Sequence, residues 1–166
     1  MLSAPGTTGW IGMCACPGGD NLFGGAVRSL ADDLDTICAW GAAGVVTLLE
    51  LEELAILDLS DIDRQAKRRG MWWLHLPVRD MCAPDGDFDT RWRVEGPRLR
   101  GILKADGRFV VHCWAGLGRT GTVAARLLTE FGVPPETAIH QVRDARPGAI
   151  QSLQQEIYVR RLGADG

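Results

Sequence analysis

A cysteine directly follows a histidine in the run HCWAGLGRTG, residues 112–121, and an arginine lies six residues after that cysteine. A cysteine thiolate is a strong nucleophile. Consecutive N–H groups of a glycine-containing loop can hold an anion, and the planar fork of an arginine can hold two phosphoryl oxygens. These residue types predict that Cys113 attacks a phosphate ester while Arg119 holds it.

The elements on either side would position this chemistry. Residues 108–112, RFVVH, form an apolar, β-branched run that predicts a buried strand, and residues 120–131 predict a helix. Cys113 would then lie between a strand end and a helix N-terminus, whose partial positive charge favours a thiolate. Thr120 can donate its hydroxyl to the sulfur, and His112 can orient the loop.

The loop itself is the expected binding site for the phosphoryl group. Gly116 and Gly118 allow its N–H groups to turn inward because glycine tolerates unusual φ values and close approach. The residues predicted to bind the phosphoryl group, or a phosphate or sulfate anion, are His112, Trp114, Ala115, Gly116, Leu117, Gly118 and Arg119.

The pattern of His-Cys, five residues and Arg-Thr-Gly resembles the signature of the cysteine-dependent protein phosphatases. Across residues 9–160, the order of WIGMCACPGG, VVTLLE, LPVRD and RPGAIQSLQQ resembles the kinase-associated, cyclin-dependent kinase inhibitor 3-like dual-specificity subgroup. The resemblance implies a compact α/β domain with a central mixed sheet and a phospho-cysteine intermediate. That subgroup acts on a phosphothreonine of cyclin-dependent kinases, but the resemblance does not carry this substrate over.

A phosphate ester also needs an acid for its leaving oxygen. Asp80 follows Pro77 by three residues, near the end of the strand predicted at residues 71–76, and it matches the Pro-x-x-Asp position of the acid in the resembling phosphatases. Asp85, further along the same loop, is the alternative.

Hydrolysis of a phospho-cysteine needs a positioned water. The segment RPGAIQSLQQE, residues 146–156, resembles the part of the family that holds a glutamine for this purpose. Gln155 is the better match to that glutamine, and Gln151 is the alternative.

Alternating strands and helices predict an α/β fold with a largely parallel sheet covered by helices on both faces. We expect one domain over residues 1–166, with a flexible start at residues 1–8. The other expected strands are 10–14, 45–49 and 71–76, and the other expected helices are 29–40, 61–69, 90–103 with an interruption at Gly96 and Pro97, 134–143 and 152–162.

Composition excludes several function classes. The formal net charge of −3 disfavours binding to nucleic acid or a membrane surface. Five cysteines without a framework spacing indicate a reducing, cytoplasmic location. Cys14 and Cys16 are better explained as small residues that pack in a strand than as a metal site, and the chemistry requires no cofactor. We expect a monomer.

The sequence therefore predicts a phosphatase for phosphotyrosine, phosphoserine or phosphothreonine in proteins. One alternative is a phosphopeptide-binding module without turnover. Another is a phosphatase for phosphoinositides or RNA 5′ ends, which shares the signature. Whether Cys82 forms a reversible disulfide with Cys113 stays open at this point.

Overall fold

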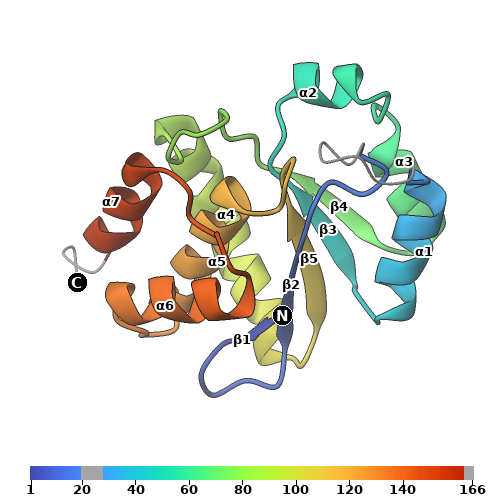
Figure 1. Cartoon of the computed structure of the whole chain (residues 1–166). Helices are drawn as coiled ribbons and strands as arrows, with labels where there is room; N and C mark the ends of the chain where they lie inside the picture. Colours follow the sequence, from blue (N-terminus) through green and yellow to red (C-terminus); the bar gives the residue numbers. More distant parts are fainter. Residues whose placement is uncertain (20–27, 163–166) are drawn as a thin grey trace.

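A computed structural model describes residues 1–19 and 28–162, which fold around one five-stranded sheet (Figure 1). The strand order is β1-β2-β5-β3-β4. Only β1 is antiparallel to its neighbour, and the other pairs are parallel, which confirms the predicted mixed sheet. The strands are β1 (Leu2–Ser3), β2 (Trp10–Cys14), β3 (Gly44–Thr47), β4 (Trp72–His75) and β5 (Arg108–His112).

Helices cover both faces of the sheet, as predicted (Figure 1). One face carries α1 (Leu30–Ala39) and α3 (Ile62–Arg68). The other face carries α4 (Gly86–Lys104), α5 (Gly118–Glu130), α6 (Pro135–Ala145) and α7 (Leu153–Arg161). A short helix, α2 (Leu51–Ile56), follows β3 near the edge where the parallel strands end.

The strands lie in the middle because their side chains are apolar on both faces. Val45 and Val110 pack toward α1 and α3, whereas Val46 and Val111 pack toward the helices of the other face. This two-sided burial is typical of parallel strands. It fixes the end of β5, and therefore the residue that follows it, deep inside the molecule.

Three elements differ from the sequence-based expectation. Leu2 and Ser3 pair with β2, and buried Leu2 and Ala4 anchor a start that was expected to be flexible. Helix α4 begins earlier than expected because Asp85 caps it, and it continues through Pro97. Helix α2 was not predicted: its Leu51 and Ile56 are exposed, so no apolar periodicity reveals it.

Candidate active site

The loop between β5 and α5 forms a buried cradle. Cys113 directly follows β5 and is only 2% exposed, and α5 begins five residues later at Gly118. Gly116 has a φ of +69°, and a Cβ there would lie 2.1 Å from the carbonyl oxygen of Cys14. Glycine is therefore required at this position to let the loop turn against the end of β2.

The carbonyl groups of this loop are held by donors from outside it. Arg146 donates from Nε to the oxygen of Gly116, at 2.5 Å, and from Nη2 to the oxygen of Ala115, at 3.0 Å. The N–H of Cys16 donates to the oxygen of Trp114, at 2.9 Å. Three successive carbonyls of residues 114–116 are thus bonded to neighbouring segments.

Arg119 is fixed by acceptors from two distant segments. Its Nη1 and Nη2 donate to the two carboxylate oxygens of Glu53, at 2.6 and 2.9 Å, and Nη1 also donates to the oxygen of Val78, at 3.1 Å. Arg119 is 1% exposed, yet its Nε has no hydrogen-bond partner among the described residues. This N–H is therefore available to a ligand.

The charge of Arg119 is secured by its surroundings. Burial by itself would lower the pKa of the guanidinium, but the hydrogen bonds to Glu53 outweigh it. The charge of Glu53 and the nearby Cys113 and Asp80 act in the same direction, so the pKa of Arg119 lies above its ordinary value. The arrangement keeps a permanent cation beside the cysteine.

Thr120 is also available for a role at the cysteine. Its side chain is fully buried in the first turn of α5, and within the described part of the chain its hydroxyl has no hydrogen-bond partner. A buried hydroxyl without a partner is rare in folded proteins.

His112 is a neutral member of a buried hydrogen-bond chain. The indole N–H of Trp73 and the Nε2 of His112 each lie 2.8 Å from the hydroxyl oxygen of Thr47. The Nδ1 of His112 lies 3.4 Å from the carbonyl oxygen of Cys113. Burial lowers the pKa of His112 to about 4, so it orients the loop without adding a charge.

The loop after β4 brings a carboxylate to the cradle. Asp80 Oδ1 lies 3.0 Å from Nη2 of Arg119, and its side chain is 65% exposed. Asp85 is used differently: it accepts a hydrogen bond from the N–H of Phe88, at 2.9 Å, and caps α4. Of the two aspartates considered from the sequence, only Asp80 contacts Arg119.

The two glutamines considered from the sequence have different surroundings. Gln151 is exposed, and its side-chain oxygen accepts from the N–H of Gly118, at 3.0 Å. Gln155 is fully buried. Its Oε1 accepts from the N–H groups of Gln151 and Ser152, and its Nε2 donates to the carbonyl oxygen of Cys82, at 3.2 Å.

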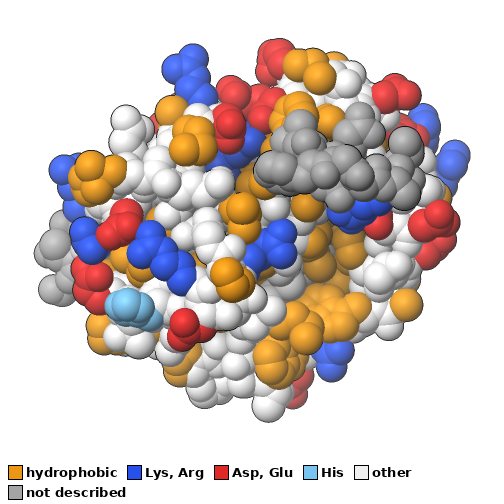
Figure 2. Space-filling view, viewed as in Figure 1, with side chains coloured by type: hydrophobic (Ala, Val, Ile, Leu, Met, Phe, Trp, Pro, Cys, Tyr) orange, Lys and Arg blue, Asp and Glu red, His pale blue; other side chains and the backbone are white. Residues whose placement is uncertain are grey.

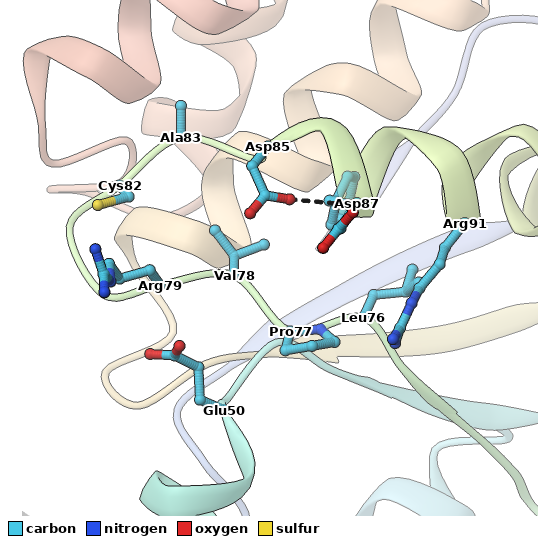
Figure 3. A pocket seen from close by; sticks show the side chains of 11 residues that line it. Glu50, Leu76, Pro77, Val78, Arg79, Cys82, Ala83, Asp85, Asp87 and Arg91 are labelled. Atoms are coloured by element: carbon cyan, nitrogen blue, oxygen red, sulfur yellow. Dashed lines mark hydrogen bonds between the residues drawn. The ribbon is translucent and has the colours of Figure 1, made fainter.

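A separate cleft of about 440 Å³ lies beside the loop after β4 (Figure 3). Pro77, Val78, Cys82 and Ala83 line it from the loop, and none of the cradle residues 112–119 does. Its further lining residues are Glu50, Leu76, Arg79, Asp85, Asp87, Phe88 and Arg91. The cleft therefore lies against the segment that carries Asp80 and is distinct from the cradle.

Sequence reasoning missed Glu53 and Arg146, which support the cradle without belonging to the signature. Glu53 lies in the acidic stretch ELEE of residues 50–53, so no feature of the sequence distinguishes it from its neighbours. Arg146 begins the RPGAIQ segment, and its position in a segment already connected with the site was the available signal.

The cysteines form no disulfide, including between Cys82 and Cys113. Burial raises the pKa of both Cys14 and Cys16 to about 12, which makes them poor thiolate ligands. Within residues 1–19 and 28–162, no group of three or more potential metal-binding side chains occurs. No helix in these ranges is long and apolar enough to traverse a membrane.

Comparisons with known proteins agree with this geometry. Residues 21–159 match the family model described as "Swiss Army Knife protein, DSP-PTPase phosphatase domain". Cyclin-dependent kinase inhibitor 3 of Rattus norvegicus is 30% identical over 167 residues, which cover 97% of this chain and 75% of the relative. PRL-1 phosphatase of Drosophila melanogaster is 34% identical over 85 residues, 48% of this chain and 47% of that protein.

A solved structure is similar over most of the chain. Kinase associated phosphatase, with its catalytic-site cysteine replaced by serine, has a TM-score of 0.82 and 26% identity, covering 93% of this chain and 86% of that one. The family-model match includes β3, β4, β5, the cradle and most of α7. The chain therefore belongs to the dual-specificity protein phosphatases of the DSP-PTPase family, which are cysteine-based hydrolases.

Proposed function

We propose that this phosphatase hydrolyses phosphotyrosine, phosphoserine or phosphothreonine in proteins through a phospho-cysteine formed at Cys113. The observation that carries the proposal is that Cys113, directly after β5, and Arg119, in the first turn of α5, are both buried, with the Nε–H of Arg119 unpartnered among the described residues. A binding module has no need for a nucleophile at the floor of its anion site.

In the first step, the Cys113 thiolate attacks phosphorus, so that an S–P bond forms and the ester P–O bond breaks. Asp80 gives its proton to the departing oxygen. Its side chain is exposed and contacts Arg119, so it can reach a bound phosphoryl group. The N–H groups of the loop and Arg119 are proposed to hold the phosphoryl oxygens through the transition state.

In the second step, a water attacks the phospho-cysteine and gives its proton to Asp80. The S–P bond breaks, and phosphate leaves the thiolate, which accepts a hydrogen bond from Thr120. Gln151 is proposed to position this water. It is exposed and lies against Gly118 of the cradle, whereas every polar side-chain atom of Gln155 is bonded to the backbone.

Exposed apolar side chains next to the site residues favour a protein substrate. Met81 follows Asp80, Leu51 lies in the same short helix as Glu53, and Leu153 follows Gln151 by two residues; they are 49%, 65% and 70% exposed. On the face shown in Figure 2, basic and acidic side chains are interspersed. A phosphoinositide or an RNA end, both polyanionic, would be better matched by a continuous basic surface.

We further propose that the protein acts in a reducing compartment and as a monomer. Five cysteines without a disulfide support a reducing compartment such as the cytoplasm. The cradle and the loop after β4 both come from one chain, which supports activity as a monomer.

The test is turnover and binding on one phosphopeptide. Cys113→Ser is expected to abolish hydrolysis, because serine lacks a reactive thiolate, while the folded protein still binds the phosphopeptide. Release of phosphate at the wild-type rate by Cys113→Ser would refute the mechanism. Tight binding without turnover by the wild-type protein would instead identify a phosphopeptide-binding module.

A further inference from the structure

The loop that carries Asp80 contains a tight turn in an unfavourable conformation. The N–H of Cys82 donates to the carbonyl oxygen of Arg79, at 3.1 Å, which closes a turn with Asp80 and Met81 at its centre. Met81 has a φ of +57°, a left-handed conformation that is unfavourable for a residue with a side chain. Contacts outside the turn must offset this unfavourable free energy if Asp80 is to stay in place.

Packing behind the loop is incomplete. Val78 at the stem is buried in the core, but Cys82 and Ala83 further along the loop border the cleft of about 440 Å³ (Figure 3). Hydrogen bonds also fix the stem of the loop: the N–H of Val78 donates to the carbonyl oxygen of Leu48, and the carbonyl oxygen of Val78 accepts from Arg119. The turn itself lies beyond these stem contacts.

Gln155 supplies a hydrogen bond just after the turn. Its Nε2 donates to the carbonyl oxygen of Cys82, the residue that closes the turn. The side-chain orientation follows from its partners: Oε1 faces the N–H groups of Gln151 and Ser152, so the NH₂ group must face Cys82. Gln155 thus joins the N-terminus of α7 to the loop that carries Asp80.

We infer that Gln155 is a positioning residue for Asp80: its hydrogen bond to Cys82 holds the turn so that the carboxylic acid meets the leaving oxygen. This inference rests on the proposed function. It assigns Gln155 a role in the first step through the loop, rather than the water-positioning role that the sequence indicated for the second step.

The substitution Gln155→Glu removes the hydrogen bond that the side chain donates to Cys82 and keeps its ability to accept from the N–H groups of Gln151 and Ser152. Glutamate can accept the same N–H groups at the third position of α7, where it is a common partner of a capping serine. It cannot donate to Cys82, and its second oxygen would face that carbonyl. Ser152→Ala is the matched control, because it weakens the cap of α7 and leaves the bond to Cys82 intact.

The experiment measures kcat/KM for a series of aryl phosphates whose leaving groups differ in basicity. A basic leaving group needs the acid, whereas nitrophenolate leaves with little help. For Gln155→Glu we expect kcat/KM to fall about thirtyfold with phenyl phosphate and less than about threefold with p-nitrophenyl phosphate. Ser152→Ala should leave both values near those of the wild type.

A double-mutant cycle with Asp80→Asn is the second readout. If Gln155 acts through Asp80, adding Gln155→Glu to Asp80→Asn should cause little further loss with phenyl phosphate. Should Gln155→Glu fail to fold, Gln155→Met removes the same donor without burying a charge, and it is compared with Ser152→Ala in the same series.

Two results would overturn the inference. An equal loss for all leaving groups would show that Gln155 does not act through the acid. Accumulation of more phospho-cysteine in Gln155→Glu than in Asp80→Asn would show that Gln155 serves the second step directly and not through Asp80. Neither result touches the proposed function, which has its own test: it fails if the wild-type protein hydrolyses none of these esters or if Cys113→Ser hydrolyses them at the wild-type rate.

Discussion

Arg119 depends on a residue outside the signature. Glu53 accepts from both terminal nitrogens of the guanidinium, which holds the plane of the fork in one orientation. Because a small displacement of a positioning group can slow a reaction strongly, this orientation is part of the site.

Glu53→Gln is therefore expected to lower kcat/KM for a phosphopeptide by about tenfold to a hundredfold. Glutamine keeps the size of the side chain but offers only one acceptor and no charge. The control is Glu52→Gln, an exposed neighbour in the same short helix. An unchanged kcat/KM in Glu53→Gln, or an equal decrease in the control, would count against this role.

His112 makes the stability of the fold depend on pH. Burial lowers its pKa to about 4, from about 6.5 in an unfolded chain. The unfolded state therefore binds the proton first as the pH falls. The contribution of this group to stability is complete above about pH 6.5 and is lost progressively toward pH 4, by about 3 kcal/mol.

Urea unfolding at a series of pH values between 7 and 4 tests this dependence. His112→Gln should be less stable at pH 7 but should lose less stability on acidification than the wild type. His140→Gln, which changes an exposed histidine, should keep the wild-type dependence. If His112→Gln and the wild type lose the same free energy, the assignment to His112 is wrong.

At the level of elements, the cradle depends on close contact between the β5–α5 loop and the end of β2. Gly116→Ala would add a Cβ 2.1 Å from the oxygen of Cys14, at a positive φ. The loop must then move, so we expect loss of phosphate binding and a fall in turnover of more than about a hundredfold.

Gly132→Ala is the matched control for that substitution. Gly132 has a φ of +84° after α5, but a Cβ there meets nothing within 4 Å. It should lower stability by about 1 kcal/mol through backbone strain and leave turnover unchanged. Similar kinetic effects of the two substitutions would show that general destabilisation, and not the contact with β2, is responsible.

The sequence predicted the elements that the core requires. The strand before Cys113 and the helix after it are marked by an apolar run and by glycines, so the cradle could be placed without a structure. Helix α2 could not be predicted, because Leu51 and Ile56 are exposed, only Leu54 is buried, and the helix is stabilised by a capping box between Glu50 and Glu53. The same helix supplies Glu53, which lies 66 positions from Arg119 in the chain.

The glutamines show a second limit of sequence reasoning. Gln151 and Gln155 are four positions apart in one segment, and a glutamine at either position suits a water-positioning role. Their difference arises from capping: the N-terminus of α7 has N–H groups without helical partners, and Gln155 turns inward to satisfy them. Which of the two glutamines bonds these N–H groups depends on the residue at which the helix starts. Sequence patterns locate the start of a helix only to within about one or two residues.

At the level of the whole molecule, three helices on one face are joined around Arg126. Its side chain is 12% exposed and hydrogen-bonds Asp89 of α4, Glu130 of α5 and Tyr158 of α7. Its guanidinium also lies 4.9 Å from the ring centre of Trp92. α5 begins at the cradle and α7 follows Gln151, so this cluster stabilises the packing of helices that lead to the site.

Arg126→Met is expected to lower the free energy of unfolding by about 2–3 kcal/mol, because it leaves the carboxylates without a buried cation. Chemical denaturation gives this value. The control Arg160→Met, at an exposed surface pair, should change stability little. Turnover of folded Arg126→Met below its unfolding temperature should stay within about threefold of the wild type.

The most direct measurement is a rapid-quench reaction of the wild-type protein with a radiolabelled phosphopeptide, followed by proteolysis. We predict that the label transiently appears on the peptide that contains Cys113, where the acid quench traps it before water can remove the phosphoryl group. The Cys113→Ser protein should acquire no label. Phosphate release without any label on Cys113, or label on another residue, would contradict a phospho-cysteine mechanism.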